Sequence, residues 1–175
     1  MRWIAFLRAV NLGARNKVPM AELRARLEAA DYEGVRTYIA SGNVLLDGPS
    51  RRKELGKVLE DLVADAFGVA TTAILRKPRE LATTLAEHPF GSDTSETYVA
   101  FLAARPTKAA VARLAEAQGA AERAVVAGAD VYLRLPRGVH GSGLSVARVE
   151  KLLGVQATLR NWRTVAALVE LAVEA

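Results

Sequence analysis

The sequence predicts an α+β protein made of two tandem halves, each with the element order β-α-β-β-α-β, and a closing C-terminal helix. Short apolar runs rich in β-branched and aromatic residues alternate with segments whose apolar residues recur every three or four positions. The order of these segments then repeats: WIAFLRAVN at 3–11 is echoed by YVAFLAARP at 98–106, with Ala-Phe-Leu in register. This echo indicates that one folding unit occurs twice.

The first half opens with a short apolar and aromatic run that predicts a strand. Pro19 suits the first turn of the next helix, because its missing N–H costs little there. Met20, Leu23 and Leu27 recur at helical spacing and predict one apolar face. Two β-branched runs on either side of Gly42 predict strands joined by a tight turn. In chain order the predicted elements are RWIAFLRAV, MAELRARLEAA, VRTYIA, NVLLD, residues 51–67 and TTAILR.

The second half repeats this pattern after a short helix from Pro78 and a linker, HPFGSDTSE, which has the Gly, Ser, Asp and Pro content of a loop. Gly128 stands between two apolar runs, as Gly42 does in the first half. The predicted strands are YVAFLAARP, the two runs of RAVVAGADVYLRL, and QATLRNW, and the predicted helices cover about 107–118, 145–153 and 164–173. The order is again β-α-β-β-α-β, followed by one more helix.

A β-α-β-β-α-β unit of about 80 residues is the ferredoxin-like arrangement, with two helices on one face of an antiparallel sheet. The expected division is residues 1–88, a half with the short linking helix, and residues 89–175, a half with the C-terminal helix. The other face of each sheet must be covered or must bind something. This fold carries many unrelated activities, so it says little about function.

Composition places limits on the function. The 24 basic and 19 acidic residues give a net charge of +5, which permits a nucleic-acid or phosphate partner without demanding one. The absence of cysteine excludes disulfides, thiolate nucleophiles and zinc–thiolate or iron–sulfur sites. The N-terminal apolar run is too short for a signal peptide or a membrane span. We therefore expect a soluble cytoplasmic protein with no membrane partner.

Neither a metal nor a cofactor is expected. His88 and His140 lack the spacing and the neighbouring carboxylates of a metal site. The glycine-rich stretch RGVHGSGLS lacks the Lys-Ser or Lys-Thr that closes a Walker phosphate-binding loop.

The loop FLRAVNLGARNKVPM at 6–20 is rich in basic and amide residues and has no acid. It ends at a helix N-terminus, which favours anions. One interpretation is a cradle for phosphate or nucleic acid. The other is a connection whose asparagines bond its own backbone, with Gly13 supplying a positive φ and the cations solvated. The candidate binding residues are Arg8, Asn11, Arg15, Asn16 and Lys17.

Two further stretches offer candidate binding residues. YIASGNV could place Ser41 and Asn43 beside the first loop, or form a turn with side-chain capping, and it lacks the elbow pattern of a hydrolase nucleophile. TLRNWRTV sets Arg160, Asn161 and Trp162 together, and basic residues beside an aromatic suit base stacking or RNA contacts. The alternative is a buried tryptophan, an arginine paired with a carboxylate of the other half, and a cap for the last helix.

These motifs resemble those of a bacterial family, domain of unknown function 1697. The family motifs are LRGINVGGKNKIPM, VRTYIQSGNV and LGV-x-ATTRNW-x-TV, and the resemblance spans nearly the whole chain. It implies a pair of ferredoxin-like halves and names no activity. Ala9, Ala14 and Arg15 depart from the first motif. Gly141 and Gly143 replace the basic pair of a family GRSKL segment, which puts an anion site there in doubt.

The leading interpretation is a binding module for an anionic, phosphate-bearing ligand, with nucleic acid among the candidates. The alternative is a small-molecule enzyme with a cleft between the halves, lined by Arg8, Ser41, Asn43 and Arg160. No complete nucleophile–base pair is visible, so the sequence leaves open whether the protein is an enzyme. A third interpretation is that the motifs join the two halves.

Overall fold

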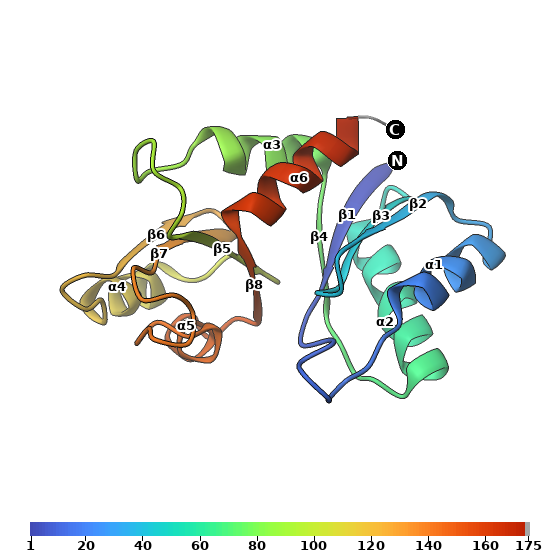
Figure 1. Cartoon of the computed structure of the whole chain (residues 1–175), viewed down its shortest axis with the longest axis horizontal. Helices are drawn as coiled ribbons and strands as arrows, with labels where there is room; N and C mark the ends of the chain where they lie inside the picture. Colours follow the sequence, from blue (N-terminus) through green and yellow to red (C-terminus); the bar gives the residue numbers. More distant parts are fainter. Residues whose placement is uncertain (174–175) are drawn as a thin grey trace. The chain divides into compact units, whose positions relative to one another are not determined.

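Each half of the chain folds as β-α-β-β-α-β around its own four-stranded antiparallel sheet (Figure 1). The computed structural model describes residues 1–173. By their packing these residues divide into two units, residues 1–81 with 168–173, and residues 82–167. The predicted α+β fold with two tandem ferredoxin-like halves and a C-terminal helix is confirmed.

The first unit has the strand order β2-β3-β1-β4, in which every neighbouring pair is antiparallel. The helices α1 and α2 lie on the same face of this sheet (Figure 1). Its elements are β1 (Arg2–Leu7), α1 (Met20–Ala29), β2 (Glu33–Tyr38), β3 (Asn43–Asp47), α2 (Arg52–Phe67) and β4 (Ala73–Arg76).

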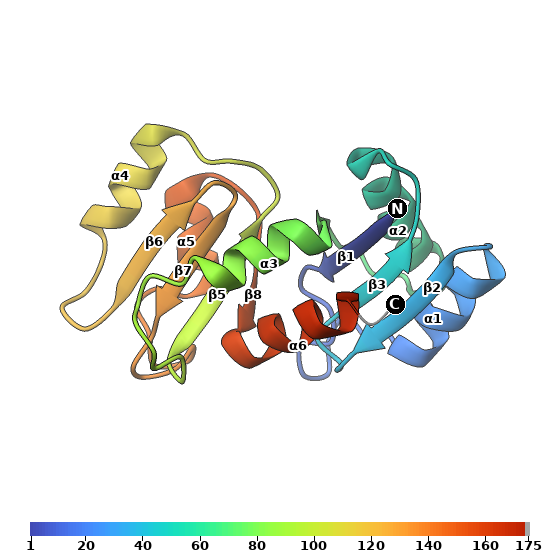
Figure 2. The same ribbon diagram turned by 90° about the horizontal axis from the view of Figure 1, so that it is seen from above.

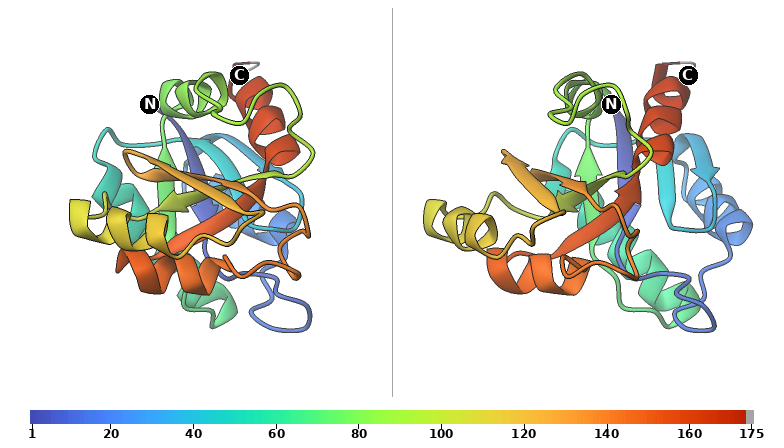
Figure 3. Two further views of the ribbon diagram at one scale, coloured as in Figure 1. Left: turned by 90° about the vertical axis from the view of Figure 1, so that its left-hand side faces the viewer. Right: turned by 60° about the vertical axis from the view of Figure 1, so that its left-hand side comes forward.

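The second unit has the equivalent strand order, β6-β7-β5-β8. Its two helices α4 and α5 pack side by side (Figures 2 and 3). The elements are β5 (Thr97–Leu102), α4 (Lys108–Glu116), β6 (Arg123–Ala127), β7 (Asp130–Arg134), α5 (Val146–Leu153) and β8 (Ala157–Asn161). Two more helices, α3 (Pro78–Ala86) and α6 (Trp162–Val173), each have residues in both units. None of the helices in residues 1–173 is long and apolar enough to cross a membrane.

Both faces of the first strand of each half are buried, which explains why these strands are continuous apolar runs. In β1, Trp3, Ala5 and Leu7 belong to the core under α1 and α2, while Ile4 and Phe6 point to the opposite face and are equally inaccessible. Residues of β5 alternate in the same way, with Ala100 and Leu102 in the helix-side core and Val99 and Phe101 buried opposite.

The duplication extends to the strand register. Phe6 lies opposite Asn43 in the first sheet, and its counterpart Phe101 lies opposite Asp130 in the second. Ile4 lies opposite Arg76, and its counterpart Val99 lies opposite Arg160. Both arginines are buried, and each donates from Nη1 to the carbonyl of the preceding residue at 2.9 Å. The two halves therefore share individual side-chain interactions as well as a topology.

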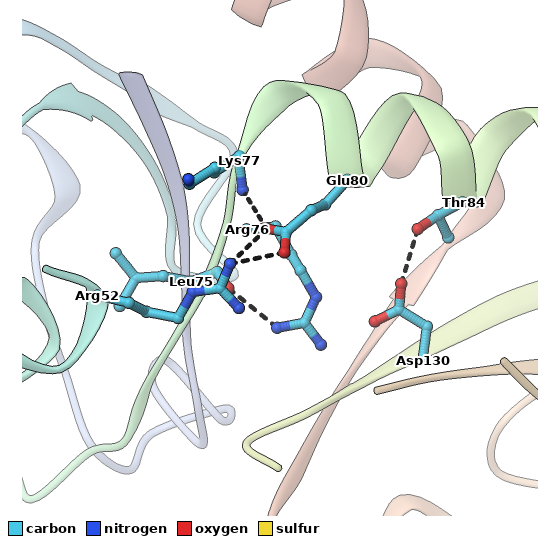
Figure 4. A network of polar contacts seen from close by, with 7 residues as sticks. All are labelled: Arg52, Leu75, Arg76, Lys77, Glu80, Thr84 and Asp130. Atoms are coloured by element: carbon cyan, nitrogen blue, oxygen red, sulfur yellow. Dashed lines mark hydrogen bonds and ion pairs between the residues drawn. The ribbon is translucent and has the colours of Figure 1, made fainter. Parts of the chain in front are cut away.

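The helix α3 is attached at each end within the unit to which that end belongs (Figure 4). At its start, Glu80 accepts hydrogen bonds from Arg52 Nη2 at 2.6 Å and from the Lys77 N–H at 2.7 Å. Towards its end, Thr84 Oγ1 donates to Asp130 at 2.7 Å, and its carbonyl accepts from the Tyr132 hydroxyl at 2.8 Å. Burial, followed by the nearby carboxylates of Asp130 and Glu87, raises the pKa of Tyr132 to about 12.

Candidate functional site

The loop between β1 and α1 folds back on itself as a narrow turn. The Asn11 N–H donates to the Asn16 carbonyl at 2.8 Å, and the Arg15 N–H donates to the Leu12 carbonyl at 3.0 Å. Asn11, Gly13 and Asn16 all have left-handed backbones, with φ between 51° and 57°. Glycine and asparagine tolerate this conformation best, so these residues explain the shape of the loop.

The amide groups of the two asparagines are used inside the protein. Asn11 Nδ2 donates to the carbonyls of Val18 at 2.9 Å and Ala40 at 2.6 Å, and its Oδ1 accepts from the Val18 N–H at 2.8 Å. Asn16 Nδ2 donates to the Ala9 carbonyl at 2.8 Å. Most of these bonds go to the backbone of the loop itself, as the structural interpretation of these asparagines expects. The bond to Ala40 also fastens the first loop to the turn between β2 and β3.

The charges of the same loop are available to a ligand. Arg15 and Lys17 are exposed, and within residues 1–173 neither side chain has a hydrogen-bond or ion-pair partner. The first acid after the loop, Glu22, is paired with Arg26 at 2.7 Å. Arg8 is half-buried and its backbone is held at both polar groups, since its N–H donates to the Thr72 carbonyl at 3.0 Å and its carbonyl accepts from the Thr71 hydroxyl at 2.7 Å.

A groove with a volume of about 470 Å³ opens beside this loop. We call it the loop groove, and its lining residues are Asn11, Lys17, Val18, Pro19, Met20, Thr37, Ile39 and Ala40. The groove reaches the N-terminus of α1, where Pro19 provides no side-chain cap for the first N–H groups. A lysine, a threonine and a helix N-terminus therefore share one concave surface with several apolar residues.

The groove is bordered by backbone in an unfavourable conformation. Ile39 has φ +51° and a side chain that is 52% exposed. A left-handed backbone is a genuine outlier for a β-branched residue. Residues 1–173 contain five non-glycine residues with positive φ, and four of them belong to this loop and the adjoining turn: Ala9, Asn11, Asn16 and Ile39. Asparagine tolerates this conformation, so the strain falls on Ala9 and Ile39, and strained backbone tends to concentrate at sites with a function.

The second motif builds the turn that carries Ile39. Asn43 is fully buried, and its Nδ2 donates to the Tyr38 carbonyl and to Ser41 Oγ, both at 2.9 Å. Gly42 packs so tightly that a Cβ added there would lie 2.5 Å from Val10 Cγ2, and its φ is +84°. These residues close the turn, and they place Thr37 and Ile39 at the loop groove.

The third motif lies in the second unit, and two of its residues are held by bonds within the protein. Arg160 is 6% exposed and donates from Nη1 to Thr158 Oγ1 at 2.7 Å, while burial lowers its pKa to about 10. It therefore stays charged at neutral pH. Asn161 Oδ1 accepts from the Thr164 N–H at 2.8 Å, so Asn161 caps the last helix as in the alternative interpretation of this motif.

Trp162 packs against an imidazole. Its ring centroid lies 4.5 Å from that of His88, which also contacts Phe90 edge-on at 5.6 Å. His88 is held at both nitrogens, with Nδ1 3.0 Å from the Gly91 carbonyl and Nε2 3.0 Å from Thr97 Oγ1. No group of three or more His, Asp or Glu side chains in residues 1–173 has the arrangement of a metal site.

The comparison with protein families covers the first two motifs, while the third motif lies beyond the matched residues. The profile of a family described as "protein of unknown function (DUF1697)" matches residues 1–132, about three quarters of the sequence. The chain belongs to the DUF1697 family. A solved structure of a conserved bacterial protein from Streptococcus pneumoniae is similar to it, with a TM-score of 0.76, 20% identity and 98% of each chain covered. At that identity the likeness shows the fold alone. A comparison with curated proteins gives no match.

In this DUF1697 chain, the predicted binding residues fall into two groups. Asn11 and Lys17 line the loop groove, and the other candidates of the first two motifs lie in the same unit. Arg160, Asn161 and Trp162 lie in the second unit. Sequence reasoning missed Met20, Thr37 and Ile39 as groove residues. No sequence signal places Ile39 there, because it follows the end of β2 in a left-handed conformation and strand alternation does not extend to it.

Proposed function

We propose that the first unit of this protein binds a small phosphate-bearing anion in the loop groove. The observation that carries the proposal is that Lys17, exposed and without a partner in residues 1–173, lines a groove that ends at the uncapped N-terminus of α1. Arg15 adds a second unpaired charge on the same loop.

The electrostatics of the loop groove favour an anion for two reasons. The partial positive charge at a helix N-terminus stabilises a negative group by about 0.3–1 kcal/mol, and an ammonium group within reach adds to this. No carboxylate among the lining residues opposes it, and the nearby Glu22 is compensated by Arg26. A phosphate could also accept hydrogen bonds from the free N–H groups of the first turn of α1.

The size of the groove favours a small ligand over an extended nucleic acid. Its volume of about 470 Å³ falls within the roughly 300–1,000 Å³ of typical small-molecule sites. Nucleic-acid binding along a strand uses a continuous basic surface with accessible aromatic residues. Arg160 is buried and Asn161 caps α6, so two residues of the basic–aromatic motif are already engaged.

Calorimetric titration with inorganic phosphate, pyrophosphate and adenosine 5′-monophosphate tests the proposal. The matched pair of variants is Arg15→Ala/Lys17→Ala in the loop and Arg51→Ala/Lys53→Ala in α2 and its N-cap, since all four side chains are exposed and both pairs remove two charges. We expect at least one ligand to bind the wild-type protein and to bind the loop variant roughly tenfold more weakly, with the α2 variant within about twofold of wild type.

Two outcomes would contradict the proposal. Equal losses in the two variants would mean that binding follows net charge and not the loop groove. Absence of binding by the wild-type protein for all three ligands at millimolar concentration would mean that the groove is not an anion site.

A further inference from the structure

We propose that the ligand of the loop groove is a nucleoside monophosphate, with its phosphate at Lys17 and its base against Met20 and Ile39. This inference rests on the proposed function, and it adds the chemical class of the ligand. The groove holds three kinds of residue side by side: a cation beside a helix N-terminus, the polar residue Thr37, and an apolar wall. A nucleotide carries the three matching parts, which are a phosphate, polar sugar hydroxyls and a flat base.

The apolar wall is larger than a bare anion needs. Besides Asn11, Lys17 and Thr37, the lining residues are apolar: the buried Val18, and Pro19, Met20, Ile39 and Ala40. An inorganic phosphate would use only the charged end of the groove and would leave Ile39 exposed to water. A ligand with a flat apolar group would cover that surface, and removing apolar area from water is favourable. Small-molecule sites generally combine an apolar lining with a few polar groups in this way.

The conformation of Ile39 also supports a role for the apolar wall in binding. Its left-handed backbone would suit glycine, yet the chain has a β-branched side chain here, 52% exposed. Such a residue opposes folding through its backbone, and its half-exposed side chain contributes little burial in return. The hydrogen bond from Asn11 Nδ2 to the Ala40 carbonyl fixes the residue that follows Ile39. Ile39 is therefore held in position at the groove. A binding contact explains why an isoleucine is retained where glycine would fold more easily.

The matching part of the second half has none of these features. The segment that joins β5 to α4 covers only residues 103–107, and the N-terminus of α4 is closed by Thr107, whose Oγ1 accepts from the Ala110 N–H at 3.2 Å. In residues 82–167 no non-glycine residue has a positive φ. The long loop, the open helix end and the strained apolar residue therefore occur together in the first unit.

The test compares adenosine 5′-monophosphate with ribose 5-phosphate and butyl phosphate, on the wild-type protein and on Ile39→Gly. Since glycine relieves the backbone, this variant is expected to fold. In the wild type the nucleotide should bind roughly fivefold or more tightly than ribose 5-phosphate, because the base covers apolar surface. In Ile39→Gly that preference should fall to about twofold or less, while the affinity for ribose 5-phosphate stays within about twofold. Val125→Gly, at an exposed valine of β6, is the control and should keep the preference.

The possible outcomes distinguish a failure of the nucleotide inference from a failure of the proposed function. Equal affinity of wild type for the nucleotide and ribose 5-phosphate overturns the nucleotide inference and leaves the anion site standing. Binding of butyl phosphate as tightly as the nucleotide also overturns it, because the wall would then select any apolar group. If none of the three compounds binds, both the inference and the proposed function fail.

Discussion

The two halves of the chain form the same sheet with the same register. They differ in the length of the segment that joins the first strand of each half to its first helix. The segment from β1 to α1 covers twelve residues, 8–19, whereas the segment from β5 to α4 covers five, 103–107. The fold therefore does not need the longer loop. The buried arginines Arg76 and Arg160, which make the same bond to the preceding carbonyl, show how closely the halves correspond elsewhere.

The two halves also differ in backbone strain and in the capping of the first helix. All five non-glycine residues with positive φ in residues 1–173 lie in the first unit, and α1 has no side-chain cap, whereas Thr107 caps α4. Because the second copy reaches the same topology without these costs, the first copy retains them for another reason. Binding at the loop groove is the reason that the exposed cations and the apolar wall support.

The equivalent turn glycines give the largest expected contrast between the halves. In Gly42→Ala the new methyl group would lie 2.5 Å from Val10 Cγ2 and 3.0 Å from Leu7 Cβ, at a φ of +84°. We expect a loss of about 3 kcal/mol or more in the free energy of unfolding. In Gly128→Ala the nearest atom is 3.9 Å away, in the Arg105 side chain, so only the backbone cost of about 1 kcal/mol remains. Urea unfolding of both variants measures the difference, and equal losses would refute the packing argument.

Asn11→Ala should have the next largest effect. It removes three hydrogen bonds and leaves the N–H of Val18, a buried residue, without its partner, which should cost about 2 kcal/mol. The comparison is Thr107→Ala, which removes one capping bond and should cost about 1 kcal/mol.

Hydrogen exchange locates the effect of Asn11→Ala. Amide protection should fall in residues 11–18 and 39–42 and stay unchanged in α4. A uniform change across the first unit would instead mean that Asn11 supports the whole fold of that unit and not specifically the loop and turn.

Ile39→Gly should change stability in the opposite direction. Glycine relieves the left-handed backbone, which costs other residues about 1–2 kcal/mol, but it adds freedom to the unfolded chain. We expect a net gain of up to about 1 kcal/mol in urea unfolding, together with the loss of nucleotide preference. A variant destabilised by more than about 1 kcal/mol would show that Ile39 is retained for packing.

The smallest expected effect concerns Glu80 at the start of α3. Burial raises the pKa of its carboxyl, but the hydrogen bonds from Arg52 and the Lys77 N–H outweigh burial and hold the pKa below its ordinary value of 4.5. The ionised form is therefore favoured by folding, so its contribution is present above about pH 4.5 and is lost as the pH falls through the lowered pKa. Because both side chains of the ion pair are 41% exposed, the effect should be about 0.5 kcal/mol or less.

Glu80→Gln tests this titration. It should be less stable than wild type at pH 7, and the difference should shrink as the pH falls below 4.5, in urea titrations across this range. The control is Glu96→Gln, which removes the 3.3 Å pair with Arg134 in the second unit and should change stability less at either pH. A difference for Glu80→Gln that persists at low pH would assign its effect to packing.

The fold was predictable because its signals are local and occur twice. Apolar spacing, turn glycines and the echo of Phe6 in Phe101 all follow from chain-level rules. For the asparagines of the first loop the sequence leaves two interpretations open, ligand binding or bonds to the backbone, and the structure shows the backbone bonds. The apolar wall was not predictable as a site. An isoleucine at the end of a β-branched run is typical of a strand, and nothing in the sequence indicates the left-handed backbone of Ile39. The burial of Arg160 also depends on tertiary packing, which spacing alone does not show.

The most direct test of ligand binding at the loop groove is a titration of the ¹⁵N-labelled protein with adenosine 5′-monophosphate, followed by amide chemical shifts. The account predicts that the shifts concentrate at the groove, in residues 11–21 and 37–40, with the α1 first-turn amides of Met20 and Ala21 among the most affected. Shifts confined to residues 82–167, or no shifts at millimolar ligand, would contradict it.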